Sequence, residues 1–302
     1  MKKRRRPLSR VRIEKRDGRL TIVGLGAWHS YWRDPYHLLL TIPWSMFLAL
    51  TTLGYLVANA LFALVYLAGG NSIVNARPGS FSDAFFFSVQ TMASIGYGAM
   101  YPRTFYANVV VTFEALIGLL GVAVGTGLAF ARFSRPTARV LFTRVAVIAP
   151  QDGMPTLMFR AANQRRNQIL EAQLRVRLVR DEITREGQFM RRFHDLQLLR
   201  SQNPVFSLSW TAMHPIDENS PLYGATAEML TESETTLVIS LVGIDETVAQ
   251  TIYARHTYVA REILWNKRFV DIVSRTGDGA RSIDYTHFHD VMPVPLVVDK
   301  PE

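Results

Sequence analysis

The chain has 302 residues, no cysteine, and 34 lysine and arginine side chains against 25 aspartates and glutamates. The lack of thiols excludes a disulfide framework, cysteine-ligated zinc or iron–sulfur sites and a cysteine nucleophile, and the hydrophobic fraction of 48% excludes a disordered chain. Residues 1–33 carry 11 basic and 2 acidic side chains, so their net charge of +9 equals that of the whole chain. Because the net positive charge is confined to this N-terminal segment, a basic tail beside an anionic membrane face is favoured over a nucleic-acid-binding surface.

A short interfacial helix is predicted ahead of the first apolar run. Asp34 is a suitable N-cap, Pro35 fits the first helical position, and Tyr36 and His37 follow. We expect this helix to lie along the membrane surface. An ordinary juxtamembrane linker is the alternative.

Two stretches are apolar enough to cross a membrane. Leu38 to Ala76 contains no Asp, Glu, Lys or Arg, and Tyr106 to Ala131 contains only Glu114. A bilayer core of roughly 30 Å requires about 20 helical residues, so we expect spans near Ile42–Leu67 and Tyr106–Ala131.

The charges that flank the spans predict their orientation. Eleven basic residues precede the first span and a series of arginines from Arg132 to Arg144 follows the second, whereas the connecting loop carries only Arg77 and Arg103. Because basic residues remain on the cytoplasmic side, both termini should be cytoplasmic.

The loop between the spans contains a third apolar segment. Ser80 or Ser82 can cap a helix whose first turn includes Asp83, and the apolar run Ala84–Met92 follows. This helix is too short to span, so it should be re-entrant and buried by neighbouring protein.

Ser94-Ile95-Gly96-Tyr97-Gly98 follows this helix directly and could form a ribbon of backbone carbonyls that binds potassium ions. Removing water from the ion requires substitute oxygens, and backbone carbonyls from four chains can supply them. Such a ribbon needs alternating unusual dihedral angles, which glycine adopts readily. We therefore expect potassium ions at the carbonyls of Ser94 to Tyr97, with Ile95 and Tyr97 packed behind the ribbon.

The second span should line the pore of a tetramer. Its small residues allow four helices to approach closely, and four residues spaced by four positions share one face: Gly118, Val122, Thr126 and Phe130. Phe130 lies where four rings could close the path, and Gly118 could be a hinge. Glu114 is expected to form hydrogen bonds behind the filter or, alternatively, with loop donors near the outer interface.

The region after Pro136 alternates apolar and polar residues with a period of two. Leu174, Val176 and Leu178 mark one strand, Phe206, Leu208 and Trp210 mark another, and the predicted hairpin turns are Asp152-Gly153 and Asp278-Gly279. Roughly 160 residues of short strands predict an antiparallel sandwich.

This half contains little that could form an active site. His287 and His289 could share one face of a strand, but no acidic spacing completes a metal site, and the remaining histidines are isolated in sequence. Phosphate-binding loops and nucleophile elbows are absent from the sequence. Enzymatic function and cofactors other than potassium ions are not expected.

The chain from about Tyr31 to Phe288 resembles the bacterial inward-rectifier potassium channels. Ser94–Gly98 resembles the signature usually written T-x-G-Y-G, although serine replaces the threonine. Further matching segments are Asp34–His37 for the slide helix, Phe85–Met92 for the pore helix, Ala131–Pro136 for the end of the inner helix, and Pro155–Arg160, Met213–Tyr223 and Glu262–Trp265 for the cytoplasmic domain.

The resemblance implies three regions: a basic tail (1–30), a slide helix and pore domain (31–135) and an immunoglobulin-like cytoplasmic sandwich (136–302). It implies a homotetrameric, multi-pass channel of the bacterial inner membrane, gated at the inner-helix bundle crossing around Phe130. Arg132, Arg135 and Arg139 would bind anionic lipids, including phosphoinositide-like headgroups. The alternatives are a membrane-anchored sensing module with a non-conducting pore, and a poorly selective cation channel permitted by Ser94.

Overall fold

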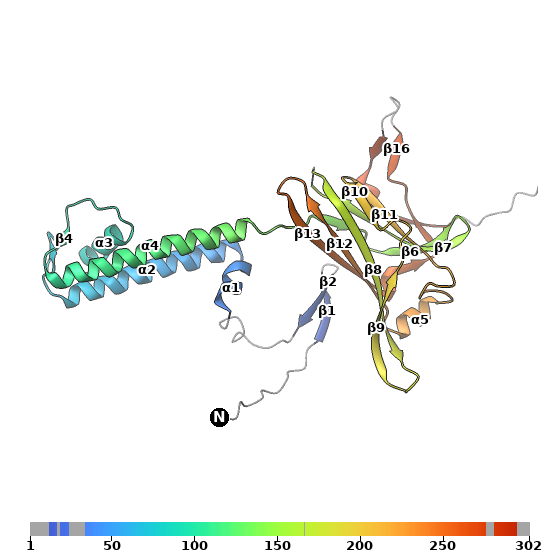
Figure 1. Cartoon of the computed structure of the whole chain (residues 1–302), viewed down its shortest axis with the longest axis horizontal. Coiled ribbons are helices and arrows are strands. Elements are labelled where there is room, and N and C mark those ends of the chain that lie inside the picture. The colour runs from blue at the N-terminus through green and yellow to red at the C-terminus, as the bar shows by residue number, and fades with distance from the viewer. Residues whose placement is uncertain (1–11, 17–18, 24–33, 166, 276–280, 295–302) are drawn as a thin grey trace, which may run out of the picture. The chain divides into compact units, whose positions relative to one another are not determined.

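The computed structural model describes residues 12–16, 19–23, 34–165, 167–275 and 281–294 (Figure 1). The chain divides into two compact units: residues 26–135, and residues 1–25 together with 136–302. Most of the predicted basic tail and the predicted turn at Asp278-Gly279 lie outside the described residues. Each unit is described by itself below.

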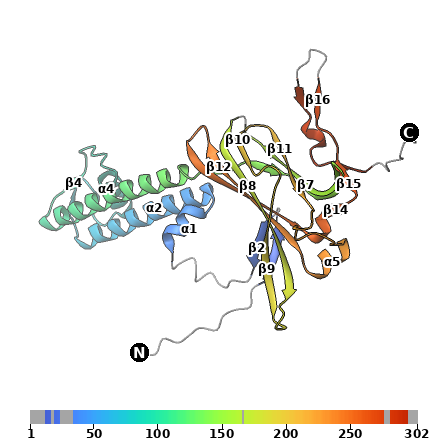
Figure 2. The same ribbon diagram turned by 45° about the vertical axis from the view of Figure 1, so that its right-hand side comes forward.

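Four helices are found among the described residues of the unit 26–135. They are α1 (Pro35–Thr41), α2 (Trp44–Ala68), α3 (Phe81–Met92) and α4 (Phe105–Phe133), and a short antiparallel pair joins β3 (Ile73–Val74) to β4 (Tyr101–Pro102). The long helices α2 and α4 lie side by side (Figures 1 and 2). Both are long and apolar enough to cross a membrane, and their bounds confirm the two predicted spans to within two residues.

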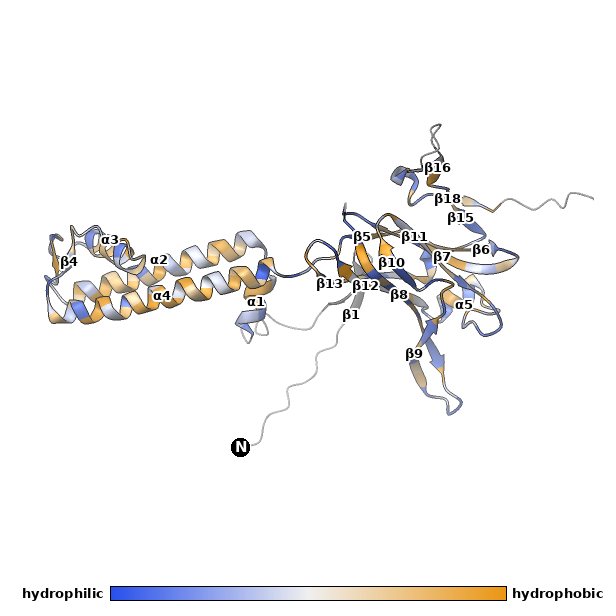
Figure 3. Ribbon diagram, turned by 45° about the horizontal axis from the view of Figure 1, so that its top comes forward, coloured by the Kyte–Doolittle hydropathy of each residue, from blue (hydrophilic) through white to orange (hydrophobic). Residues whose placement is uncertain are grey.

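Most residues of these two helices are hydrophobic, as the hydropathy colouring of the ribbon shows (Figure 3). Large side chains such as Leu53, Leu61 and Leu119 are more than half exposed in the single chain. Exposure of these apolar side chains to water would be strongly unfavourable, whereas contact with lipid or with a neighbouring helix would bury them.

Side-chain caps fix the starts of the two shorter helices, as predicted. The Asp34 carboxylate accepts a hydrogen bond from the His37 backbone N–H (3.0 Å), and Pro35 occupies the first turn of α1. Ser80 rather than Ser82 caps α3 by accepting from the Asp83 N–H (3.3 Å). With 12 residues, α3 is about 18 Å long and cannot cross a bilayer.

Two five-stranded sheets dominate the unit that contains residues 136–302. The first contains β10 (Gln202–Phe206), β8 (Ile169–Ile183), β12 (Thr236–Asp245) and β13 (Gln250–Val259) in this order, with β9 (Phe189–Leu196) also paired to β8. The second contains β11 (Ser209–Pro215), β7 (Met154–Asn163), β6 (Ala146–Gln151) and β14 (Ile263–Trp265), with β5 (Val140–Phe142) also paired to β7. All pairings within these sheets are antiparallel except β14 with β6.

Smaller elements complete this unit. The described residues of this unit also form three two-stranded pairs: β1 (Arg12–Arg16) with β2 (Arg19–Val23), β15 (Lys267–Phe269) with β18 (Val291–Pro293), and β16 (Val273–Arg275) with β17 (Arg281–Ile283). The short helical segments are α5 (Ala227–Glu232), η2 (Ala260–Glu262) and η3 (Tyr285–His287).

The main core lies between the two large sheets and confirms the predicted sandwich. Leu174, Val176 and Leu178 of β8 are buried there with Leu157 and Phe159 of β7. Asp152 and Gly153 both have positive φ values, 52° and 80°, and join β6 to β7 as the predicted two-residue hairpin turn. Two membrane-length helices followed by a sandwich are the predicted architecture.

The predicted strand through Phe206, Leu208 and Trp210 is wrong. β10 ends at Phe206 and pairs with β8, whereas β11 begins at Ser209 and pairs with β7 in the other sheet. The chain therefore changes sheets between these strands. The Phe206 and Trp210 rings meet edge-to-face in the core with centroids 5.9 Å apart, while Leu208 is exposed. Two aromatic anchors facing one core from opposite sheets produce the same sequence spacing as one half-buried strand.

Candidate functional site

The segment after α3 has the alternating backbone that its glycines predicted. Gly96 and Gly98 have φ values of 61° and 79°, and Ser94 shares this left-handed conformation with φ of 55°. For serine this conformation costs about 1 kcal/mol, so the surrounding structure must hold it in place. Left-handed residues at every second position give a ribbon that can turn successive carbonyls toward one edge.

Hydrogen bonds anchor both ends of this ribbon. At the inner end, the backbone N–H groups of Ser94 and Ile95 donate to the Thr91 and Gln90 carbonyls, at 3.0 and 2.8 Å. At the outer end, the Asn75 side-chain amide donates to the Ala99 carbonyl (2.8 Å). Asn75 was not identified from the sequence; its positive φ of 63° is typical of an asparagine in a turn.

The packing expected behind the ribbon does not occur within one chain. Tyr97 is 74% exposed and Ile95 is 45% exposed. Any cover for these side chains has to come from outside the chain.

Gly118 is separated from the other residues predicted on its face of α4. It is buried, and a Cβ atom at this position would clash with the Met92 carbonyl oxygen and lie 3.1 Å from Met92 Cγ. Val122, Thr126 and Phe130 are not buried in the chain, with exposed fractions of 66% for Val122 and 72% for Phe130. Gly118 therefore forms the seat for the end of α3, and the three others remain available to line a pore.

Glu114 lies in the interior of the helical unit, with a fully buried side chain. Its carboxyl group forms hydrogen bonds with the Tyr66 hydroxyl of α2 and the Ser88 hydroxyl of α3. Ser88 Oγ also lies 2.9 Å from Asn59 Oδ1. Of the two partner sets expected for Glu114, these contacts are with the neighbouring helices α2 and α3 and not with loop donors.

Arg132 and Arg135 reach the C-terminal end of α1. The Arg132 guanidinium donates to the Leu39 carbonyl and, at 2.6 Å, to the Ile42 carbonyl, and Arg135 donates to the Leu40 carbonyl at 2.9 Å. The last carbonyls of a helix have no partner within the helix and carry partial negative charge, so these arginines cap α1. This role was not predicted from the sequence, because the helix end and the arginines are more than 90 residues apart.

Aromatic rings surround the Arg132 guanidinium. Its central carbon lies 4.6 Å from the Trp44 ring centroid and 4.7 Å from that of Phe47, and Trp44 also packs against Phe133 at 4.6 Å. Cation–π contacts of this kind contribute about 0.5–2 kcal/mol each. They join the start of α2 and the end of α4 around one charge.

The other predicted surface residues are accessible. Tyr36 and His37 of α1 are exposed. Arg139 is also exposed, but it belongs to the other compact unit, where its carbonyl accepts from the Gln164 N–H at 2.9 Å.

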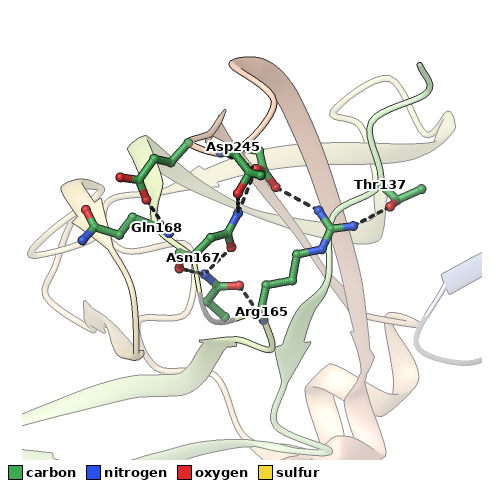
Figure 4. Close-up of polar contacts among 8 residues, drawn as sticks. Thr137, Arg165, Asn167, Gln168 and Asp245 are labelled. Atoms are coloured by element: carbon green, nitrogen blue, oxygen red, sulfur yellow. Dashed lines mark hydrogen bonds and ion pairs between the residues drawn. The ribbon is translucent and has the colours of Figure 1, made fainter. Parts of the chain in front are cut away.

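A buried carboxylate organises one end of the sandwich (Figure 4). Asp245, at the end of β12, accepts hydrogen bonds from Arg165 and Asn167, both at 2.8 Å, and from the Thr247 N–H at 2.9 Å. The second terminal nitrogen of Arg165 donates to Thr137 Oγ1 at 2.8 Å. The network thus joins the β7–β8 loop to the β12–β13 hairpin and to the segment that follows Pro136.

Burial by itself would raise the pKa of Asp245. The hydrogen bonds from Asn167 and Thr247 and the Arg165 charge outweigh burial, so the pKa lies below the usual value for aspartate. The ionised form is therefore the one that the folded sandwich favours.

Three histidines in the described part of the sandwich have hydrogen-bond partners. His194 Nε2 lies 2.8 Å from Glu182 Oε1, and buried His214 contacts the Gln197 carbonyl and Ser220 Oγ at 2.6 and 2.8 Å. His287 lies in η3 and not on a strand, where it pairs with Asp290 at 2.7 Å. Among the described residues no group of three or more His, Asp or Glu could hold a metal ion.

Comparison with known proteins places both units in one family. The "Inward rectifier potassium channel C-terminal domain" family matches residues 140–300, and the "Ion channel" family matches residues 45–135. The inward rectifier potassium channel Kirbac3.1 of Paramagnetospirillum magnetotacticum is 52% identical over 94% of this chain and 97% of its own length. The chain belongs to the inward-rectifier potassium channel family.

Vertebrate inward rectifiers are also similar to this chain. The ATP-sensitive inward rectifier potassium channel 12 of Gallus gallus is 31% identical over 88% of this chain and 67% of its own length. The human inward rectifier potassium channel 18 is 30% identical over 88% and 66%, respectively. The predicted resemblance to bacterial inward rectifiers is confirmed, and a member of this channel family is not an enzyme.

In this inward rectifier, Asp245→Asn is expected to destabilise the sandwich. The neutral amide of asparagine cannot replace the charged carboxylate of Asp245 as the acceptor for Arg165. Because Arg165 is partly exposed, the expected loss in the free energy of unfolding is limited to about 2 kcal/mol, or about 5 °C in melting temperature. Because the folded-state pKa is depressed, the stabilisation by the native carboxylate is present above its unfolded pKa and decreases as pH falls through the folded value. Thermal unfolding of the full-length protein between pH 7 and pH 3 should show a steeper acid loss for wild type than for the variant; equal slopes would contradict this role.

Proposed function

We propose that four copies of this chain form a potassium channel through which ions move passively, down their electrochemical gradient. The observation that carries the proposal is the ribbon with left-handed residues at Ser94, Gly96 and Gly98. This ribbon begins at the end of a capped helix too short to span and leads into a helix long enough to span. Only a few structures require such a ribbon at membrane depth, and a selectivity filter is one.

Four copies are needed because one ribbon presents a single row of carbonyls. A dehydrated potassium ion requires oxygens on all sides, which a fourfold ring of Ser94–Tyr97 carbonyls supplies. The exposed Ile95 and Tyr97 side chains would then be covered by neighbouring copies. Permeant potassium ions are the only bound ions that this arrangement requires.

The gate that we propose is a ring of Phe130 side chains. Phe130 lies near the C-terminal end of α4, on the part of the helix that the chain leaves uncovered. In the proposed channel this end faces the cytoplasm, and Val122 and Thr126 line the path toward the filter. A ring of phenyl groups can block ions by excluding water even without full mechanical closure. Both chain termini would lie in the cytoplasm, following the excess of basic residues there.

Anionic lipid is the proposed modulator, acting on Arg132 and Arg135. Phosphate oxygens offer these guanidinium groups the same kind of acceptor as the α1 carbonyls that they contact. A headgroup that binds them would therefore compete with the cap of α1. This competition couples lipid binding to the position of α1 against the end of α4.

Replacing both arginines by glutamine is expected to weaken the response to anionic lipid. Each charge is worth about 1 kcal/mol at an anionic surface, so the lipid fraction that half-changes the flux should rise by about tenfold or more. Potassium flux in vesicles with increasing phosphoinositide content measures this shift. Arg175→Gln, which removes an exposed arginine of β8, is the control; an unaltered lipid response in the double variant would argue against the proposal.

The experiment that tests the channel itself is reconstitution into liposomes with potassium and sodium flux compared. We expect a potassium flux that exceeds the sodium flux at least tenfold and that barium blocks. A non-conducting sensing module would show neither flux, and a poorly selective cation channel would pass both ions at similar rates.

A further inference from the structure

If Glu114 is an ionised carboxylate, the side chains around it contain too few donor hydrogens for the oxygen–oxygen contacts that they make. Ser88 Oγ contacts two oxygens, Glu114 Oε1 and Asn59 Oδ1, but a hydroxyl group has one hydrogen to donate. If Glu114 were ionised, one of these two contacts would join two oxygens with no hydrogen between them. All three side chains are fully buried, so such a contact would lack compensation from water.

The orientation of the Asn59 amide is fixed by its other contacts. Its nitrogen donates to the Tyr55 carbonyl at 2.8 Å and lies 3.6 Å from Met92 Sδ. Exchanging the amide nitrogen and oxygen would bring the Asn59 oxygen against the Tyr55 carbonyl oxygen. Asn59 therefore presents an acceptor to Ser88, and Ser88 uses its hydrogen there.

We infer that Glu114 is held as a neutral carboxylic acid that donates a hydrogen bond to Ser88 and thereby positions the pore helix. The donors then form one continuous series. Tyr66 donates to Glu114, Glu114 to Ser88, Ser88 to Asn59, and Asn59 to the Tyr55 carbonyl. Every hydrogen has one acceptor, and α3 is joined to both membrane-spanning helices.

The charges near this cluster agree with a neutral acid. Among the described residues no Lys, Arg or His forms an ion pair with Glu114, and the other ionisable group in contact is the Tyr66 hydroxyl of α2. On α3 the contact is Ser88, and the nearest charged residue of that helix, Asp83, is paired with Arg77 at 2.9 Å. An unpaired carboxylate buried in a membrane would be strongly disfavoured, whereas a hydrogen-bonded acid is tolerated.

The consequence for the filter follows from the position of Ser88. It lies one turn before Met92, whose Sδ contacts Asn59 and whose carbonyl abuts Gly118, and the filter begins two residues later. The neutral acid therefore fixes the end of α3 from which the ribbon starts. Glu114 is a positioning residue in this account, and its effect on selectivity rests on the function proposed above.

Infrared difference spectroscopy on the reconstituted full-length protein tests the protonation state directly. The spectrum of wild type minus Glu114→Gln at neutral pH should contain the carbonyl-stretch band of a protonated carboxylic acid, shifted when the glutamates carry carbon-13. If the difference spectrum lacked this band and contained only carboxylate bands, Glu114 would be ionised and the inference would be overturned. This measurement does not depend on ion flux, so it decides the state of Glu114 even if the protein fails to select potassium.

The ratio of potassium to sodium flux tests the positioning role. A glutamine can donate to Ser88 and accept from Tyr66, so Glu114→Gln should lower the ratio by no more than about twofold, whereas Ser88→Ala and Glu114→Ala should lower it about tenfold or more. Thr112→Val, which removes a hydroxyl from the exposed side of α4, is the matched control. A loss in Glu114→Gln as large as in Glu114→Ala would mean that a negative charge is required, and would refute the neutral acid.

Discussion

Gly118→Ala is expected to abolish potassium flux while leaving the tetramer assembled. The added methyl group would clash with the Met92 carbonyl oxygen and approach Met92 Cγ to 3.1 Å and its carbonyl carbon to 3.2 Å. Because the obstructing atoms include backbone at the end of α3, relief requires the helix end itself to move. Overpacking of this kind costs about 1–3 kcal/mol per chain. A shift of Met92 would also move Ser94, which follows two residues later in the chain.

Gly121→Ala is the matched control for this prediction. Gly121 lies on the same helix, and a Cβ atom there meets nothing within 4 Å in the described chain. Alanine is also the better helix former by about 1 kcal/mol, so this variant should keep its flux. Liposome flux and size-exclusion chromatography on the same samples provide the comparison. Wild-type flux from Gly118→Ala would show that the contact with Met92 does not constrain the filter.

Gly96→Ala is the second change for which we expect a large effect, a loss of at least tenfold in the potassium-to-sodium flux ratio. Gly96 has a φ of 61°, and a Cβ atom there would meet nothing within 4 Å. The penalty is therefore conformational and amounts to about 1–2 kcal/mol in each of four chains. Relaxation toward a right-handed backbone would rotate the adjacent carbonyls away from the ion path.

The control for the filter variant is Gly54→Ala in α2. Gly54 lies within a regular helix, and an added methyl group there also meets nothing within 4 Å, so only the backbone conformation distinguishes the two sites. Flux of both ions in liposomes, with and without barium, measures the difference. A Gly96→Ala protein with wild-type flux and selectivity would contradict the proposed role of the ribbon as the selectivity filter.

Local sequence signals predicted the elements that depend on neighbouring residues. Asp34 and Pro35 identified the start of α1, Ser80 was one of two candidate caps for α3, and Asp152-Gly153 identified the hairpin between β6 and β7. The same reasoning failed at Phe206 to Trp210, where alternation continued through a change of sheet. Residues close in sequence determine a cap or a turn, but they carry no information on which sheet a strand joins.

The second large sheet shows another limit of periodicity. Eight consecutive residues of β7, Thr156 to Asn163, are buried. On the face that is turned away from the core, Met158 packs in a cluster with residues of β15 and β18, and Ala162 packs in another with Ile272 and Phe288. A strand covered on both sides has no polar face and gives no alternation in sequence. The strands predicted most clearly, such as β8, alternate because one of their faces remains accessible.

The amino-acid sequence by itself determined the two membrane spans, the short capped helix between them and the glycines of the ribbon, because each depends on length, apolar composition or a backbone requirement of adjacent residues. Only the tertiary structure decided the partners of Glu114, the seat of α3 on Gly118 and the capping of α1 by Arg132. These contacts join residues 26 to 93 positions apart, and the side chains involved meet only after the helices have packed.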